Sequence, residues 1–186
     1  MDRIRAFIAI DIEDEKVKIN LEEFQKRIVE SGVDVKLVEP DNIHLTLRFL
    51  GDIEQNNIQK IVDSLRNVNL SPFDIQFRGV GAFPSLSHMN VIWVGIGAGR
   101  EELVRISESL EAGLQRIGIP KDKKGFSPHI TIARLKSGRN KQSLARLLGE
   151  QSDAEFGMMR VDSIRLKRSV LTPQGPIYST LFEMKA

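Results

Sequence analysis

Two short stretches of the sequence repeat one pattern of residues that could do chemistry. "IHLTLRFLG" and "PHITIAR" each hold a histidine that is followed two positions later by a threonine. Successive side chains of a strand point to opposite faces, so His44 and Thr46 should share one face. The same holds for His129 and Thr131 in the second stretch. The sequence therefore predicts two strands, each with an aliphatic face and a His/Thr face.

Two imidazoles on opposite sides of one substrate can act as a general base and a general acid, because unperturbed histidine titrates near neutrality. A phosphodiester suits this pair, since in-line attack needs a base at one apical oxygen and an acid at the other. Threonine hydroxyls can donate to the non-bridging oxygens and stabilise the developing charge. The alternative is that each pair lies on a solvated sheet face, where threonine is favoured by its strand propensity.

The expected helices and strands occur in an order that repeats. Helical stripes are expected over residues 13–32, 54–66, 100–117 and 140–149, and the closing segments 156–171 and 176–184 are expected to form a strand pair. Residues 1–97 and 98–186 each contain a His-x-Thr strand, a helix and two further strands. We therefore expect one bilobal domain over 1–186 with a pseudo-twofold, duplicated α+β fold, antiparallel sheets lining a central cleft and helices outside.

The composition excludes several classes of site. The 186 residues include no cysteine, which rules out disulfides, thiolate zinc sites and cysteine nucleophiles. The formal charge of +2 permits an anionic partner without requiring one. No signal peptide or membrane-spanning stretch is apparent, and nothing suggests an interface helix, so we expect a cytoplasmic monomer. "GIGAG" lacks the lysine and hydroxyl residue of a P-loop.

Taken in order, the motifs resemble those of the two-histidine (2H) phosphoesterases, and among them the LigT-like RNA 2′,3′-cyclic phosphodiesterases, also called 2′-5′ RNA ligases. "RAFIAID" is similar to the family's opening strand, and "HLTLRFLG" and "HITIAR" to its two signature motifs. "AFPS" with "VIWVG" resembles the segment between them, and "LKRSVLTPQGPIYSTL" the closing hairpin. The resemblance covers nearly the whole chain and implies metal-independent hydrolysis of an RNA 2′,3′-cyclic phosphate to a 2′-phosphate, without a cofactor, and ATP-independent 2′-5′ RNA ligase activity in reverse.

Carried over by motif, the resemblance implies that His44 and His129 form the catalytic acid/base pair. It assigns Thr46 and Thr131 to phosphate binding. For hydrolysis we expect His129 to activate water and His44 to protonate the leaving 3′ oxygen, although the pseudo-symmetry makes these roles easy to exchange.

Four weaker candidates accompany the two motifs. Arg134 is expected at the phosphate only if a bulge or the strand end turns it from strict alternation, and is otherwise a surface charge. Arg48 is in phase with Thr46 and could line the cleft or lie on a solvated strand end. Phe7 could stack on a terminal base or belong to the core. Tyr178 could line the cleft rim or cap the hairpin.

Other functions remain open at this point. A 2H enzyme could act on a small cyclic nucleotide or trim an RNA 3′ end, and a non-catalytic RNA-binding module could share the fold. A zinc enzyme is disfavoured, because catalytic zinc usually takes three protein ligands, the third histidine, His88, is poorly placed, and no HExxH-type spacing occurs.

Overall fold

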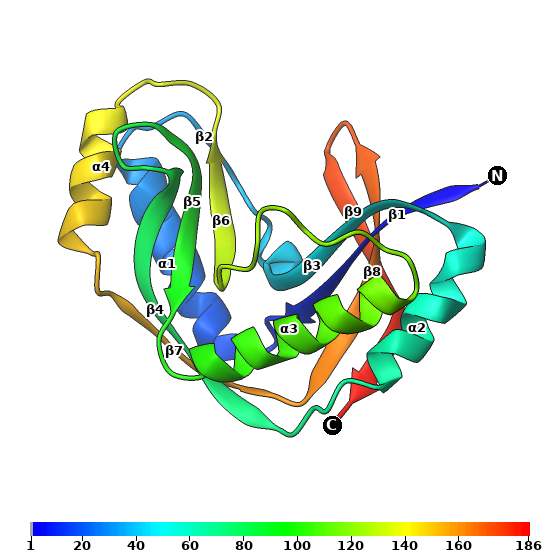
Figure 1. The fold of residues 1–186 in the computed structure, drawn as a ribbon. Helices are drawn as coiled ribbons and strands as arrows, with labels where there is room; N and C mark the ends of the chain where they lie inside the picture. The colour runs from blue at the N-terminus through cyan, green and yellow to red at the C-terminus, as the bar shows by residue number, and fades with distance from the viewer. Residues whose placement is uncertain (1) are drawn as a thin grey trace.

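The computed structural model describes residues 2–186 as a mixed α/β fold with a curled antiparallel sheet (Figure 1). The strands are β1 (Arg3–Asp11), β2 (Val35–Leu37), β3 (His44–Glu54), β4 (Phe73–Pro84), β5 (Met89–Ile96), β6 (His129–Leu135), β7 (Glu155–Val161), β8 (Ser163–Thr172) and β9 (Gly175–Lys185). The α-helices are α1 (Glu15–Glu30), α2 (Ile58–Arg66), α3 (Arg100–Arg116) and α4 (Lys141–Glu150). Within this part of the chain, no helix is long and apolar enough to cross a membrane.

The sheet has two matching halves that meet between the two His-x-Thr strands. Its strand order is β7-β4-β5-β6-β3-β1-β8-β9, with β2 pairing additionally with β6, and every pairing is antiparallel. Counted from either end, the fourth strand carries a His-x-Thr motif. Figure 1 shows the two halves curling upward, with α1 and α4 beside the half that contains β4 and β5, and α2 beside the half that contains β9. The expected bilobal α+β arrangement is confirmed.

The boundary expected at residue 97 does not separate the two halves of the sheet. Strands β1 and β3 from the first half of the chain lie with β8 and β9 from the second, while β4 and β5 lie with β6 and β7. Both edges of β1 are occupied, by β3 and by β8, so the β4–β5 hairpin has to pair elsewhere and builds the other half around β6. The repeated order of elements does reflect a symmetry, but each lobe draws strands from both halves of the sequence.

The closing segment expected over 156–171 is two strands at different places in the sheet. β7 pairs with β4, whereas β8 pairs with β1 and forms the hairpin with β9. Only Asp162 separates the two strands, and no Gly or Pro marks the break. The β8–β9 hairpin itself is confirmed.

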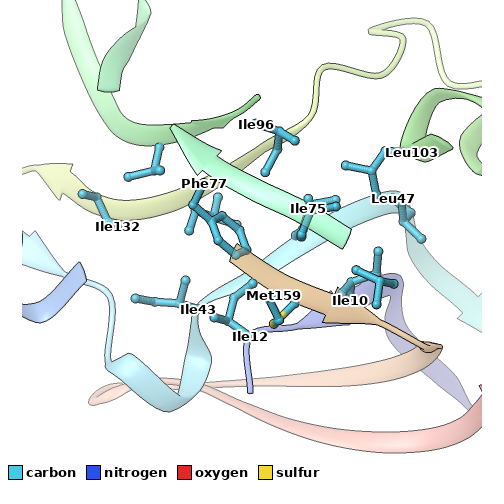
Figure 2. Packing of buried hydrophobic residues seen from close by; sticks show 14 of the residues in the cluster. Ile10, Ile12, Ile43, Leu47, Ile75, Phe77, Ile96, Leu103, Ile132 and Met159 are labelled. Carbon is cyan, nitrogen blue, oxygen red and sulfur yellow. The ribbon is translucent and has the colours of Figure 1, made fainter. Parts of the chain in front are cut away.

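One hydrophobic core joins both lobes on the face of the sheet that the helices cover. Figure 2 shows side chains from β1, β3, β4, β5, β6 and β7 packed with Leu103 of α3. Leu45 and Ile130, the aliphatic residues that follow the two motif histidines, are fully buried and pair directly across β3 and β6. Burying a side chain of this size contributes about 1.5–3 kcal/mol. The aliphatic faces thus hold the two His/Thr faces on the opposite, open side of the sheet.

Each His-x-Thr strand contains a bulge at the same point. In β3, Thr46 pairs with Ala9 and Arg48 pairs with Ile8, so Leu47 is the extra residue. In β6, Thr131 pairs with Trp93 and Ala133 pairs with Ile92, so Ile132 is the extra residue. A bulge reverses the alternation beyond it. Phe49 and Arg134 therefore occupy equivalent positions and return to the His/Thr face.

Candidate functional site

A cleft of about 510 Å³ lies over the junction of the two lobes and receives both motifs. His44 and Thr46 line it from β3, and His129 and Thr131 line it from β6. The rest of its wall includes Arg134, the loop before β6 at Phe126 and Ser127, and the β8–β9 hairpin from Thr172 to Tyr178. The structure therefore brings together the four residues of the two motifs that the sequence places far apart.

Both histidine rings are held by the same local hydrogen bond. His44 Nδ1 lies 2.7 Å from the carbonyl oxygen of Asn42, two residues before it. His129 Nδ1 lies 2.6 Å from the carbonyl oxygen of Ser127, again two residues before it. A carbonyl can only accept, so Nδ1 carries the proton in each ring. This leaves Nε2 of both histidines as the nitrogen that can take or give a proton in the cleft.

Aromatic side chains support each imidazole. Phe7 stacks on His44 with ring centroids 4.8 Å apart, and Tyr178 meets the same imidazole edge-on at 5.2 Å. Phe83 meets His129 edge-on at 5.0 Å and contacts Trp93 at 5.3 Å. These contacts restrict ring rotation and reduce water contact at both histidines.

Burial lowers the pKa of both histidines below the ordinary value of 6.5. At His44, desolvation is opposed by the hydrogen bond to Asn42 and by the charge of Asp11, while Lys167 and Arg134 lower its pKa further. At His129, desolvation is opposed by the hydrogen bond to Ser127, and Arg134 lowers the pKa further. At neutral pH both rings therefore favour the uncharged form when the cleft holds no anion.

A network of charges lies behind His44. Asp11 pairs with His44 across β1 and β3, and its carboxylate accepts from Lys167 Nζ at 2.8 Å and from Arg165 Nη1 at 2.6 Å. Arg165 also contacts Glu13 and Glu183. Burial acts to raise the pKa of Asp11, but the hydrogen bonds from Lys167 and Arg165 outweigh it and lower that pKa. The sequence analysis missed Asp11, although alternation along β1 places Asp11 on the same face of the strand as Ala9 and Phe7.

The two arginine candidates have different environments because of the bulges. Arg134 is exposed and lines the cleft, and no ion pair ties it to another side chain within residues 2–186. Arg48 borders the cleft but is only 9% exposed, and its guanidinium binds Glu111 of α3. It is therefore not a solvated strand end, and its charge is paired with Glu111. The alternation argument placed Arg48 on the face of Thr46 because it did not include the bulge.

The two aromatic candidates also have different environments. Phe7 is 4% exposed and packed against His44, so its face is not free to stack on a base. Tyr178 lines the cleft, and burial raises the pKa of its hydroxyl. Phe49, which the sequence analysis did not single out, is 63% exposed and lines the cleft. Phe49 faces the cleft because the bulge at Leu47 shifts the alternation along β3. The sequence alone does not reveal that bulge.

The remaining histidine is separate from the site. His88 is exposed in the turn between β4 and β5. In the described part of the chain, no three or more histidine, aspartate or glutamate side chains gather as a group that could hold a metal ion.

Comparison with known proteins places this geometry in a family. Residues 6–185 match the family model described as the AKAP7 2′5′ RNA ligase-like domain. The chain is 45% identical over 159 residues to the RNA 2′,3′-cyclic phosphodiesterase of Aeropyrum pernix, covering 86% of this chain and 90% of that protein. It is 41% identical over 182 residues to the Archaeoglobus fulgidus protein of the same name, covering 96% and 98%.

Solved structures agree with these sequence matches. The crystal structure of TT0787 from Thermus thermophilus superposes with a TM-score of 0.82 at 30% identity, covering 98% of this chain and 97% of that one. Escherichia coli LigT in its apo form superposes with a TM-score of 0.77 at 19% identity, covering 100% and 98%, and shares the fold. With a family model that spans almost the entire sequence and relatives this similar, the chain belongs to the AKAP7 2′5′ RNA ligase-like family of 2H phosphoesterases.

Proposed function

We propose that this protein hydrolyses a 2′,3′-cyclic phosphate at the end of an RNA chain to a 2′-phosphate. The observation that carries the proposal is the pair of histidines that enter one cleft, each with Nδ1 tied to a carbonyl and Nε2 left to exchange a proton. Both the Aeropyrum pernix and the Archaeoglobus fulgidus relatives carry the name RNA 2′,3′-cyclic phosphodiesterase, which supports the same substrate.

The reaction needs one neutral and one protonated histidine. His129 Nε2 takes a proton from water as the oxygen attacks phosphorus, and the bond from phosphorus to the 3′ oxygen breaks. His44 Nε2 gives its proton to that leaving oxygen, so the products are a 2′-phosphate and a 3′-hydroxyl. The hydroxyls of Thr46 and Thr131 donate to the non-bridging oxygens, where negative charge develops. The two histidines end in exchanged protonation states and reset through solvent.

The assignment of acid and base rests on Asp11. Its carboxylate lies opposite His44 and stabilises the protonated form of that ring, although burial still holds the pKa of His44 below 6.5. No carboxylate acts on His129 in this way within the described chain. Asp11 therefore supports the protonated form of His44, which suits the ring that starts the reaction with the proton, and His129 without such a carboxylate suits the ring that starts neutral.

The rest of the cleft suits an RNA end. Arg134, which forms no ion pair within residues 2–186, acts on both rings through its charge and can form a bidentate contact with phosphate. Phe49 offers an open aromatic face to a base. A 5′-hydroxyl that replaces water in the same attack would yield a 2′-5′ bond. Ligation is thus a change of nucleophile rather than a reversal of hydrolysis. We propose that the protein acts as a cytoplasmic monomer without a metal.

Incubating the purified protein with a short RNA that ends in a 2′,3′-cyclic phosphate, in excess EDTA, tests the proposal. The expected product is a 2′-phosphate, identified by chromatography against 2′- and 3′-phosphate standards. A 3′-phosphate would contradict the proposed direction of ring opening. An unchanged RNA would overturn the proposed substrate, and the same assay with a small 2′,3′-cyclic nucleotide would then test the alternative 2H activity.

The pH dependence of kcat/KM follows from the two lowered histidine pKa values. The free enzyme is active when one ring is neutral and the other protonated, so kcat/KM should rise and fall with the two pKa values of the pair. Because both lie below 6.5, kcat/KM should already be falling as the pH rises past about 6.5. Initial rates at low substrate between about pH 4.5 and 8.5 measure this. A plateau that extends above about pH 7.5 would contradict it.

A further inference from the structure

Arg48 and Glu111 form a buried ion pair on the helix side of the His44 strand. Arg48 Nε lies 2.8 Å from Glu111 Oε2, and Arg48 Nη2 lies 3.3 Å from Glu111 Oε1, so the contact is bidentate. The side chain of Arg48 is 9% exposed and that of Glu111 is 19% exposed. Burial acts to raise the pKa of Glu111, but the hydrogen bond and charge of Arg48 outweigh it and lower that pKa. The Glu111 carboxyl is therefore ionised at neutral pH, opposite the Arg48 guanidinium.

The same two side chains also hold the loop that leads into the second motif. Arg48 Nη2 donates to the carbonyl oxygen of Pro120, and its Nη1 donates to the carbonyl of Phe49. Glu111 Oε1 accepts from the backbone N–H of Asp122 at 3.2 Å. The pair thus clamps residues 120–122 against the strand that carries Thr46 and His44.

The clamped loop is the segment that orients the second histidine. It runs from Pro120 to Pro128 without helix or strand, and Phe126 and Ser127 line the cleft. The Ser127 carbonyl accepts a hydrogen bond from His129 Nδ1–H and so sets which ring nitrogen is left for the substrate. A shift of this loop would therefore change the tautomer and the orientation of His129.

The sheet itself ties the two motif strands together only weakly. β3 and β6 share the single paired position Leu45–Ile130, whereas β3 pairs with β1 from Arg3 through Asp11. The two histidines lie next to this single junction. The Arg48–Glu111 pair joins β3 to the loop before β6. It therefore connects the two lobes where few backbone hydrogen bonds fix the relative position of the histidines.

We propose that Arg48 and Glu111 are positioning residues, which hold the loop over 120–128 so that His129 presents Nε2 to the cleft in register with His44. This inference rests on the proposed function insofar as His129 is catalytic. Neither side chain takes part in the reaction, and both act through the loop and the Ser127 carbonyl. No sequence motif marks the pair. Simple alternation along the strand placed Arg48 on the same face as Thr46, and so pointed away from a contact with Glu111.

The test is the double substitution Arg48→Met/Glu111→Leu, which removes the clamp without leaving one buried charge unpaired. Replacing a buried ion pair by apolar residues is often nearly neutral for stability, so the melting temperature should stay close to that of the wild type. The matched control is Arg78→Met/Asp153→Leu. That ion pair is also bidentate, at 2.8 and 2.6 Å, but it lies outside the cleft and is solvent-exposed.

Two readouts separate positioning from folding. In 15N NMR at a pH where both rings are neutral, His129 should be the Nδ1–H tautomer in the wild type and should populate the Nε2–H tautomer in the double variant. His44, which is held by Asn42, should keep the Nδ1–H tautomer in both. For cleavage of a cyclic-ended RNA, kcat should fall about 10- to 100-fold with little change in KM, as expected for misplacement of a reacting group.

An unchanged His129 tautomer, or a kcat equal to that of the Arg78/Asp153 control, would overturn the inference. The NMR measurement needs no substrate. If the wild-type protein failed to cleave RNA, the proposed function would fall, while the tautomer would still decide whether the clamp orients His129.

Discussion

Replacing His129 by asparagine is expected to lower kcat for hydrolysis of a cyclic-ended RNA by about 10²–10⁴-fold, the usual contribution of one general acid or base. The amide of asparagine can neither take nor give a proton at neutral pH. His44→Asn should produce a loss of the same order, because the leaving oxygen then departs without a proton. Single-turnover rates with saturating enzyme measure the chemical step directly. Circular dichroism of each variant checks that the fold is retained.

The double variant His44→Asn/His129→Asn should lose much less than the product of the two single losses. A base and an acid that act in one step form a unit, so the second removal costs little once the first is made. His88→Asn is the matched control, since His88 is exposed in a turn outside the cleft and should leave kcat unchanged. Single variants that kept more than about a tenth of wild-type kcat would refute the two-histidine mechanism.

The positions of the two motifs could be predicted from the sequence because period-two alternation is a local property. Apolar residues at Leu45 and Ile130 determine which face of each strand is buried, so the His/Thr face had to be the open one. Four helices were also predictable from their stripes, and Asp14 caps the start of α1, where its side chain accepts from the N–H of Val17. Such signals depend on near neighbours in the chain.

The features that the sequence analysis did not predict depend on pairing between strands that are distant in the sequence. The bulges in β3 and β6 arise from their registers with β1 and β5, and they turn Phe49 and Arg134 into the cleft while Arg48, at the border of the cleft, binds Glu111. The separation of β7 from β8 at Asp162 depends on the two strands finding partners at opposite parts of the sheet. Neither feature leaves a turn residue in the sequence. The candidates beyond the two motifs were therefore the ones that needed the structure.

Replacing Asp11 by asparagine is expected to lower the free energy of unfolding by about 3 kcal/mol, since it removes the carboxylate that Lys167 and Arg165 share. The estimate is at the low end for a buried pair because Arg165 keeps Glu13 and Glu183, and Lys167 is 12% exposed. For a chain of this length the melting temperature should fall by about 6–12 °C. Thermal unfolding followed by circular dichroism at pH 7 measures this.

The pH dependence distinguishes this electrostatic loss from a packing defect. The folded-state pKa of Asp11 is depressed below 3.8, so its contribution is present above that value and is lost as the pH falls through the folded pKa. The gap in melting temperature between wild type and Asp11→Asn should therefore close at low pH, whereas a packing defect would persist. Asp153→Asn, which breaks an exposed arginine contact, should shift the melting temperature little at either pH.

Because Asp11 also favours protonated His44, the pKa of that ring should fall further in Asp11→Asn, which moves part of the pH–rate profile to lower pH. An Asp11→Asn variant with wild-type stability and an unmoved His44 titration would show that the charge network neither supports the fold nor prepares the proton donor.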